Sequence, residues 1–328
     1  MTQNGNFKRR IRARAAKTGE SYTAALSHIR KSSLNDLAPV ARSVRLAVAQ
    51  TTVYDDPRNI AGLRASGLEM RRLMRQACDA GAKLIHFPEG ATCSPDKRII
   101  SSSGPKTVGP ADWSRFEWDV LREELDATRA LARELGLWTV FGSVHQLTEP
   151  HRPHNSLYVV SDKGNLVTRY DERLLSNTKI SFMYTPGSIP VTFEVDGIRF
   201  GCSLGMESHF PEIFSEYEQL DVDCVLFSTT GATPAFAAEV LGHAASNRYW
   251  VSFSVLAYPG FLPPSGIVAP SGEWMARCPA DATPSFAIVD VDDNPGDLAR
   301  PWRRTARAGI YKQHLVEDDP RSGSRDKF

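Results

Sequence analysis

The acidic residue whose position is most informative is Glu89, in the stretch HFPEG at 86–90. Residues 83–87 (KLIHF) have the apolar character of a buried strand. Glu89 would therefore stand just beyond the carboxyl end of a strand, where open α/β folds place their active sites. A carboxylate at that point suits general-base catalysis. A loop glutamate that caps a helix or joins a salt bridge is the alternative interpretation.

The chain contains five cysteines: Cys78, Cys93, Cys202, Cys224 and Cys278. Their odd number, wide spacing and lack of CxxC pairs predict neither a disulfide framework nor a zinc site. We therefore expect no metal and no cofactor. Cys202 and Cys224 lie in apolar segments, where a cysteine packs as a small hydrophobic residue. Cys93, four residues after Glu89, is an alternative nucleophile.

The elements that must position these side chains alternate along the chain. We expect helices over 57–80, 119–135 and 235–249. We expect strands over 44–50, 83–87, 137–142, 155–161, 164–171, 191–195, 198–204, 222–228, 250–257, 266–270 and 286–290. Strands that alternate with long helices, interrupted by hairpins, predict mixed sheets covered by helices. Two such halves could stack as an αββα sandwich.

Several segments, taken in order, resemble the carbon–nitrogen hydrolases of the nitrilase superfamily. They are VRLAVAQ at 44–50, FPEGA at 87–91, NSLYVVSDKGNLVTRYDERLL at 155–175, GIRFGCSLGMESHFPEIF at 197–214, DVDCVLFSTTG at 221–231 and HAASNRYWVSFS at 243–254. The resemblance implies an αββα sandwich and a Glu-Lys-Cys triad. In that triad the glutamate is the general base, the lysine stabilises the oxyanion, and the cysteine forms a thioester or thioimidate.

Carried over residue by residue, the resemblance assigns the three catalytic positions to Glu89, Glu172 and Gly205. Glu89 matches the family's glutamate. The family's lysine motif reads Tyr-x-Lys-x-x-Leu, whereas residues 170–175 read YDERLL, so Glu172 stands where lysine is expected. The nucleophile lies five residues before the phenylalanine of Phe-Pro-Glu, which is Gly205 here. Two catalytic side chains are then replaced, and no thioester can form at residue 205. Shifting the register by one residue would offer Arg173 as the cation instead.

A lysine seven residues after Glu172 offers a compensation. Lys179 could pair with Glu172 or Glu89 and so return a cation to the site, although a surface lysine on a loop is the alternative. The resemblance also places five residues around the pocket as ligand-binding candidates: Tyr184, Met206, Glu207, His209 and Thr230. Within that set, the Met206 backbone N–H corresponds to the oxyanion-hole donor, and His209 could equally be an ordinary residue at a helix start.

The charge is divided unevenly along the chain. The 39 basic and 38 acidic side chains give a formal net charge of +1, but residues 1–33 carry eight lysines and arginines against one glutamate. That stretch is therefore +7, and the remainder is −6. We predict a basic helical arm (1–33) with helices over 7–16 and 19–31, a linker (34–43), a hydrolase domain (44–304) and a C-terminal tail (305–328). Residues 300–304 (RPWRR) are expected to pack at a subunit or domain edge, with phosphate binding as the alternative.

Composition narrows the classes of function. A 41% hydrophobic and 23% charged chain without a long apolar run predicts a globular protein with no membrane span. The cysteine pattern and the lack of an apolar segment typical of a secretory signal predict a cytoplasmic location, with a mitochondrial transit peptide as the alternative. A near-zero net charge argues against a nucleic-acid surface over the whole chain. The resemblance implies a homo-oligomer acting on a small molecule. Three functions stay open: a diverged homologue that binds an amide-, nitrile- or carbamoyl-like ligand, an enzyme of altered mechanism using Glu89, Glu172 and Lys179, or an interaction protein acting through its basic arm.

Overall fold

The chain forms two compact units, Met1–Ala41 and Arg42–Phe328. The computed structural model describes residues 3–19, 21–26, 41–231, 233–258, 263–294 and 296–323. In the first unit, α1 (Gln3–Thr18) is longer than the predicted helix over 7–16. Residues 22–26 form a second helical segment, and the buried side chains of Ile11 and Ala25 join the two. Residues 27–40, which include most of the predicted linker, lie outside the described part.

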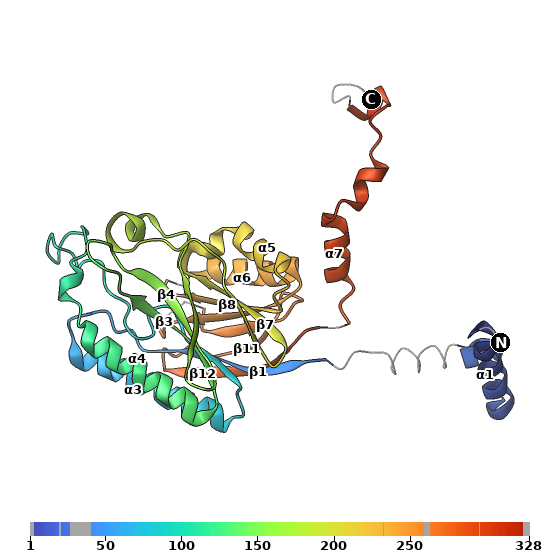
Figure 1. Ribbon diagram of the computed structural model, residues 1–328, viewed down its shortest axis with the longest axis horizontal. Helices are drawn as coiled ribbons and strands as arrows, with labels where there is room; N and C mark the ends of the chain where they lie inside the picture. The colour runs from blue at the N-terminus through green and yellow to red at the C-terminus, as the bar shows by residue number, and fades with distance from the viewer. Residues whose placement is uncertain are drawn as a thin grey trace. The chain divides into compact units, whose positions relative to one another are not determined.

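In the described part of the second unit, twelve strands form two six-stranded sheets (Figure 1). The first sheet has the order β12-β1-β2-β3-β4-β5 and the second the order β11-β10-β9-β8-β7-β6. The strands of the first sheet are β1 (Ser43–Gln50), β2 (Leu84–His86), β3 (Trp138–His145), β4 (His154–Val160), β5 (Leu166–Asp171) and β12 (Ser285–Asp292). Those of the second sheet are β6 (Thr192–Val195), β7 (Ile198–Leu204), β8 (Cys224–Thr229), β9 (Trp250–Val255), β10 (Gly266–Val268) and β11 (Trp274–Arg277). In each sheet the three central strands, β1–β2–β3 and β7–β8–β9, run parallel.

Helices cover the outer face of each sheet. α3 (Ile60–Asp79) and α4 (Trp118–Leu135) pack on the first sheet, and α5 (Pro211–Gln219) and α6 (Pro234–Asn247) pack on the second. The inner faces of the two sheets pack against each other and form a separate apolar core. The layers are therefore α, β, β and α (Figure 1), which confirms the predicted αββα sandwich.

Strand β1 illustrates how sequence produces these layers. Leu46 and Val48 alternate with Ala47 and Ala49, and all four side chains are buried. The larger pair belongs to the core between the sheets, whereas the two alanines face α3 and its neighbours. A strand buried on both faces is uniformly apolar, and the small alanines leave room for the helix.

Local capping explains one difference between expected and observed bounds. The predicted helix over 57–80 begins at Ile60, because the Asn59 side chain accepts a hydrogen bond from the Gly62 N–H at 3.0 Å and caps the helix there. Strand β11 was not expected from the sequence, and helix α5 was indicated only by the alternative of a helix start at His209. Both are short, and short elements have little periodicity to detect.

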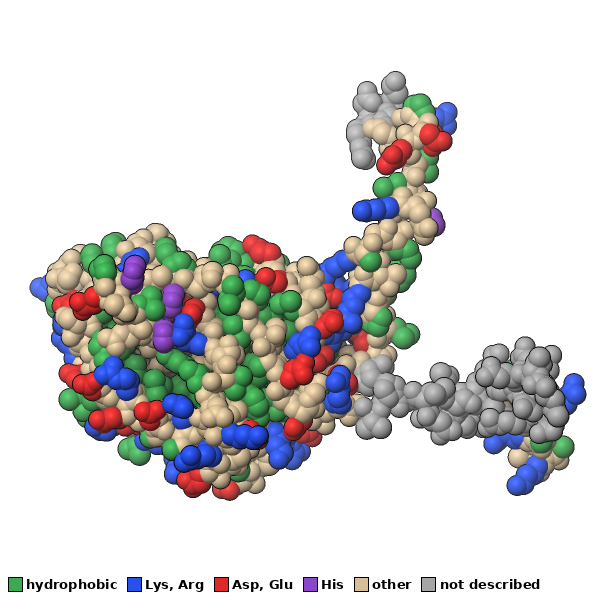
Figure 2. Space-filling view, in the orientation of Figure 1, with side chains coloured by type: hydrophobic (Ala, Val, Ile, Leu, Met, Phe, Trp, Pro, Cys, Tyr) green, Lys and Arg blue, Asp and Glu red, His purple; other side chains and the backbone are tan. Residues whose placement is uncertain are grey.

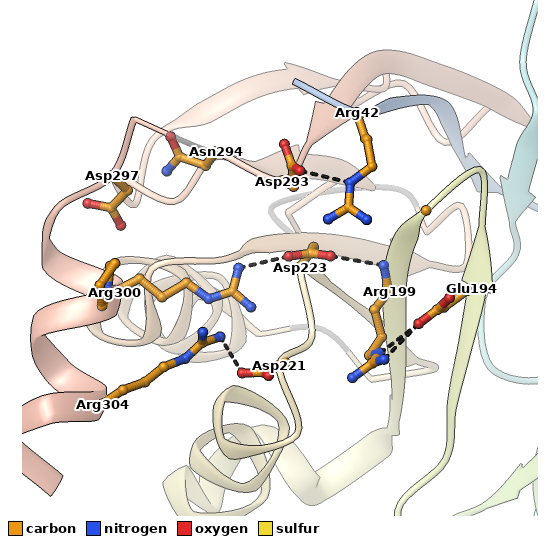
Figure 3. A pocket seen from close by; sticks show the side chains of 12 residues that line it. Arg42, Glu194, Arg199, Asp221, Asp223, Asp293, Asn294, Asp297, Arg300 and Arg304 are labelled. Atoms are coloured by element: carbon orange, nitrogen blue, oxygen red, sulfur yellow. Dashed lines mark hydrogen bonds and ion pairs between the residues drawn. The ribbon is translucent and has the colours of Figure 1, made fainter. Parts of the chain in front are cut away.

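The C-terminal helix α7 (Ala299–Arg307) docks through arginines. Arg300 donates to Asp223 at 2.8 Å and to the Val222 carbonyl at 2.7 Å, and Arg304 pairs with Asp221. These residues line a pocket of about 380 Å³. Dashed lines in Figure 3 mark the hydrogen bonds and ion pairs between its arginines and carboxylates. The segment 300–304 thus packs on the chain's own body, and the boundary expected at residue 304 falls inside α7.

The surface of the second unit mixes both signs of charge. On the face shown in Figure 2, lysines and arginines alternate with acidic side chains. No helix in the described residues is long and apolar enough to cross a bilayer.

Candidate active site

A pocket of about 480 Å³ opens where several strands of both sheets end. Glu89, Asn155 and Lys179 line it, together with Tyr184 and Thr230. Glu89 follows β2 in the first sheet, and Thr230 follows β8 in the second. The pocket therefore draws on both halves of the sandwich. Its rim carries Val53, Asp55, Ser94, Asp96, Lys97, Thr178 and Tyr258.

The backbone after β2 delivers Glu89 to the floor of the pocket. The Phe87 N–H donates to the Val140 carbonyl at 2.8 Å, and the Gly142 N–H donates to the Pro88 carbonyl at 3.1 Å. A Cβ at Gly142 would lie 2.6 Å from Glu89 Cα, which is closer than atoms can approach. Gly142 therefore lets the loop cross β3 in contact with it, and the Glu89 side chain ends 3% exposed.

Lys179 joins Glu89 to Glu172. Its Nζ lies 2.5 Å from Glu89 Oε1 and 2.7 Å from Glu172 Oε2. Lys179 begins a short π-helix (Lys179–Met183), whose wider turn is uncommon and recurs at functional sites. The structure therefore brings together Glu89, Glu172 and Lys179, which the sequence analysis grouped as two carboxylates paired with one lysine.

Asn155 completes this cluster. Its Nδ2 donates to Glu89 Oε1 at 2.9 Å and to Glu172 Oε2 at 2.6 Å. The sequence analysis gave Asn155 no role beyond the start of a strand. The available signal was the hairpin register, because Ser156 pairs with Asp171 and so places Asn155 beside Glu172.

The second oxygen of Glu89 is held from the opposite sheet. The Thr230 N–H donates to Glu89 Oε2 at 3.0 Å. Glu89 thus accepts from Lys179, Asn155 and Thr230, and these three partners fix both of its carboxylate oxygens. A carboxylate held in this way presents a defined face to the pocket.

Burial and charge shift the protonation of the cluster. Burial raises the pKa of Glu172 to about 7, which Lys179 opposes and Glu89 reinforces. For Lys179, burial alone would lower the pKa, but attraction to Glu172 and Glu89 outweighs it and raises the pKa above the ordinary value. The lysine therefore stays charged, while Glu172 exchanges its proton near neutral pH.

Gly205 lies directly against this cluster. It has φ +56°, in the left-handed region that favours glycine. A Cβ added there would collide with Glu172 Oε1 and lie 2.9 Å from Lys179 Nζ. Glu172 and Lys179 therefore fill the space that a side chain at residue 205 would need. Glu172 Oε1 itself has no hydrogen-bond partner among the described residues.

Three of the cysteines are buried in positions that make them poor nucleophiles. Cys202 and Cys224 lie in the core between the sheets, as expected. Cys93 lines the pocket but is 1% exposed, and burial raises the pKa of its thiol well above the ordinary value. A thiol that stays protonated is unreactive. The structure therefore argues against Cys93 as a substitute nucleophile.

Three expected ligand-binding residues lie away from the described pocket lining. Glu207 is fully buried and accepts from the Leu204 N–H at 2.8 Å and the Arg173 N–H at 2.6 Å. It therefore clamps the turn after β7 to the segment after β5. His209 pairs with Glu239 at 2.6 Å, and Met206 packs on the apolar core beneath α5 and α6.

Tyr184 and Thr230, in contrast, do line the pocket. Arg173, the alternative cation, pairs with Glu216 at 2.7 Å rather than with Glu89. In the part of the chain that the structure describes, no group of three or more His, Cys, Asp or Glu side chains could hold a metal ion.

Comparison with known proteins gives the same fold. The sequence matches the family model described as "Carbon-nitrogen hydrolase" over residues 45–300. An amidase of the nitrilase superfamily from Nesterenkonia AN1 aligns with a TM-score of 0.64 at 17% identity, covering 82% of this chain and 99% of that chain. The glutamine-dependent NAD+ synthetase from Acinetobacter baumannii aligns with a TM-score of 0.61 at 19% identity, covering 76% of this chain and 45% of that chain.

Proposed function

This chain belongs to the carbon-nitrogen hydrolase family, and we propose that it is a diverged member that binds a small amide-, nitrile- or carbamoyl-like ligand without forming a cysteine thioester. The observation that carries the proposal is the occupied space at Gly205. Glycine offers no nucleophile, and Glu172 and Lys179 take the volume that a cysteine side chain would need. Covalent catalysis at this position therefore has neither the atom nor the room that it requires.

The remaining donors and acceptors of the cluster suit a neutral amide. An ammonium group has three N–H donors, and Lys179 uses two of them on Glu89 and Glu172. The third can donate to a ligand carbonyl oxygen, while a ligand N–H can donate to the Glu89 carboxylate. Structures of the Nesterenkonia amidase have been solved with butyramide and with acrylamide added at its active-site cysteine, which supports amides as the first ligands to try.

Isothermal titration calorimetry with acetamide, butyramide, propionitrile and urea tests the proposal. We expect saturable binding of at least one compound, no release of ammonia and no covalent adduct in the intact mass. Lys179→Met should weaken binding at least about tenfold, because a charge-assisted hydrogen bond is lost. Lys106→Met is the matched control, since Lys106 is an exposed lysine outside the lining of the pocket. If no compound of the panel binds, the proposal fails.

A second function is favoured by Glu172. Its free Oε1 and its pKa of about 7 fit a group that takes up and gives back a proton. In such an enzyme, water would lose a proton to Glu89 as its oxygen bonds to the carbonyl carbon. The C–N bond would then break as Glu172 protonates the leaving nitrogen. Release of ammonia that Glu89→Gln abolishes would favour this enzyme over the binding protein.

A further inference from the structure

A buried polar cluster, made of His86, Ser228 and Ser252, lies between the two sheets beside the site. His86, the last residue of β2, is fully buried and faces the second sheet. Its Nδ1 lies 2.9 Å from Ser252 Oγ in β9, and its Nε2 lies 2.7 Å from Ser228 Oγ in β8. Its neighbour on the same face of β2, Leu84, belongs to the apolar core. A buried imidazole is costly unless both nitrogens are paired, and here both are.

The hydrogen bonds assign the tautomer of this histidine. Ser228 Oγ donates to the Phe87 carbonyl at 3.0 Å, so its only proton is already committed. Ser228 must therefore accept from His86, which places the ring proton on Nε2. Nδ1 is then the acceptor, and Ser252 donates to it. Burial lowers the pKa of His86 to about 3, so the ring stays neutral at physiological pH.

This polar cluster and the hydrogen bond from Thr230 to Glu89 both join the end of β2 and its following loop to the end of β8. His86 and Phe87 contact Ser228, and two residues further along the second segment the Thr230 N–H donates to Glu89 Oε2. Each contact crosses from the first sheet to the second. Apolar packing alone tolerates small sliding of one sheet over the other, whereas a fully paired polar network specifies one arrangement.

We propose that His86 is a positioning residue that locks the loop carrying Glu89 onto β8 and thereby sets Glu89 against Thr230. It acts through Ser228, with the proton order His86 Nε2–H to Ser228 Oγ–H to the Phe87 carbonyl. The geometry of the Glu89 cluster depends on this chain of donors, whichever ligand the pocket takes. The inference stands apart from the proposed function, because it concerns the placement of the carboxylate and not its chemistry.

Two serine variants of the full-length protein separate positioning from general packing. Ser228→Ala breaks the relay to Phe87, whereas Ser252→Ala removes a hydroxyl of equal size on the other ring nitrogen. We expect Ser228→Ala to speed hydrogen exchange of the Thr230 amide about tenfold, the effect of one lost hydrogen bond. We also expect it to shift the pH midpoint of the Glu172 carboxyl carbon in NMR titrations. Ser252→Ala leaves Nδ1 unpaired but keeps the Ser228 contacts, so it should lower the free energy of unfolding while changing Thr230 exchange less than Ser228→Ala does.

Histidine variants and the imidazole spectrum complete the test. His86→Gln keeps a donor near the Nε2 position and should restore Thr230 protection, whereas His86→Leu should not. Nitrogen-15 spectra of the ring should show a protonated Nε2 and a bare Nδ1 from pH 5 to 8. Equal Thr230 exchange in Ser228→Ala and wild type, or a proton on Nδ1, would overturn the proposal. Because no readout uses a ligand, failure here is distinct from failure of the proposed function.

Discussion

At the scale of single residues, the candidate site holds one lysine in contact with two carboxylates. A carboxylate occupies position 172, where the resemblance implies a lysine, and Lys179 supplies a cation from further along the chain. The ammonium group lies between two carboxylates rather than beside a thiol. When Glu172 is protonated, the Lys179 ammonium balances the Glu89 carboxylate, and the cluster can remain buried without a bound ion.

The pKa of Glu172 predicts how stability depends on pH. Its folded value of about 7 is raised above the ordinary value of 4.5. A raised folded pKa gives stability that is complete below the unfolded pKa and is lost as the pH rises through the folded pKa. Between pH 5 and 8 the wild type should therefore lose up to about 3 kcal/mol of unfolding free energy relative to Glu172→Gln.

Urea unfolding of both proteins at pH 5, 6, 7 and 8 measures this difference. Glu212→Gln, on the exposed side of α5, is the control and should follow the wild-type slope. Parallel stability curves for wild type and Glu172→Gln would contradict the prediction.

The crowding around Gly205 predicts which changes would rebuild a nucleophile. Gly205→Cys with Glu172→Lys still leaves Lys179 Nζ 2.9 Å from the new Cβ and adds a second buried ammonium. We expect this double variant to be strongly destabilised. Adding Lys179→Ala should remove both the steric contact with the new Cβ and the second ammonium. About 1–2 kcal/mol of strain would remain, because residue 205 has a left-handed backbone conformation.

Acrylamide labelling followed by peptide mass spectrometry reports the outcome. The triple variant should carry the adduct at residue 205, whereas the wild type should not be labelled there. A folded double variant that is labelled as fast as the triple variant would show that Lys179 does not obstruct the position.

At the scale of elements, two short helical segments place charged side chains that the strands do not carry. The π-helix Lys179–Met183 turns a loop lysine into the pocket, so the cation depends on a local backbone irregularity. Helix α7 docks through arginine side chains, in contrast to the apolar packing of α3 to α6. In both segments, the hydrophobic periodicity of the sequence does not predict where the charged side chains lie.

The two arginine pairs of α7 should differ in energy. Arg300 and Asp223 are each about nine-tenths buried, whereas Arg304 and Asp221 are about half exposed. Arg300→Met leaves Asp223 buried without its cation and should cost about 3 kcal/mol. Arg304→Met should cost less than about 1 kcal/mol.

Denaturant unfolding of the two single variants gives the comparison. The double variant Arg300→Met/Asp223→Asn should recover part of the loss, because the uncompensated charge is removed with its partner. Equal losses from Arg300→Met and Arg304→Met would contradict the assigned burial.

At the scale of the whole molecule, the chain is two units of different character. The first is a small basic helical pair, and the second holds both sheets and the pocket. Because every described contact of the pocket cluster lies within Arg42–Phe328, we expect the body to fold without residues 1–41.

Deletion of residues 1–41 tests this independence. Calorimetry should give a melting temperature within about 2 °C of the full chain, since no core residue of the body is removed. Ligand affinity of the pocket should also be unchanged. If the protein acts instead through its basic arm, the deletion abolishes that action while the pocket still binds. A body that fails to fold would contradict the prediction.

The sequence by itself determined the layered fold and placed a glutamate directly after a buried strand. Alternating strands and amphipathic helices encode which faces are buried, and a motif such as FPEGA at 87–91 keeps its place relative to a strand. The assignment of Glu89, Glu172 and Gly205 to the catalytic positions of the family stays a prediction from these motifs. These are local properties, and short-range order along the chain preserves them.

Only the tertiary structure decided which distant groups meet. Asn155 joins the cluster through the register of β4 and β5, and Thr230 reaches Glu89 from the other sheet. The same packing buries Glu207, whose carboxylate accepts from the Arg173 and Leu204 N–H groups. Contacts between segments far apart in sequence depend on how the sheets stack, and the periodicity of one segment carries no record of its partner in another.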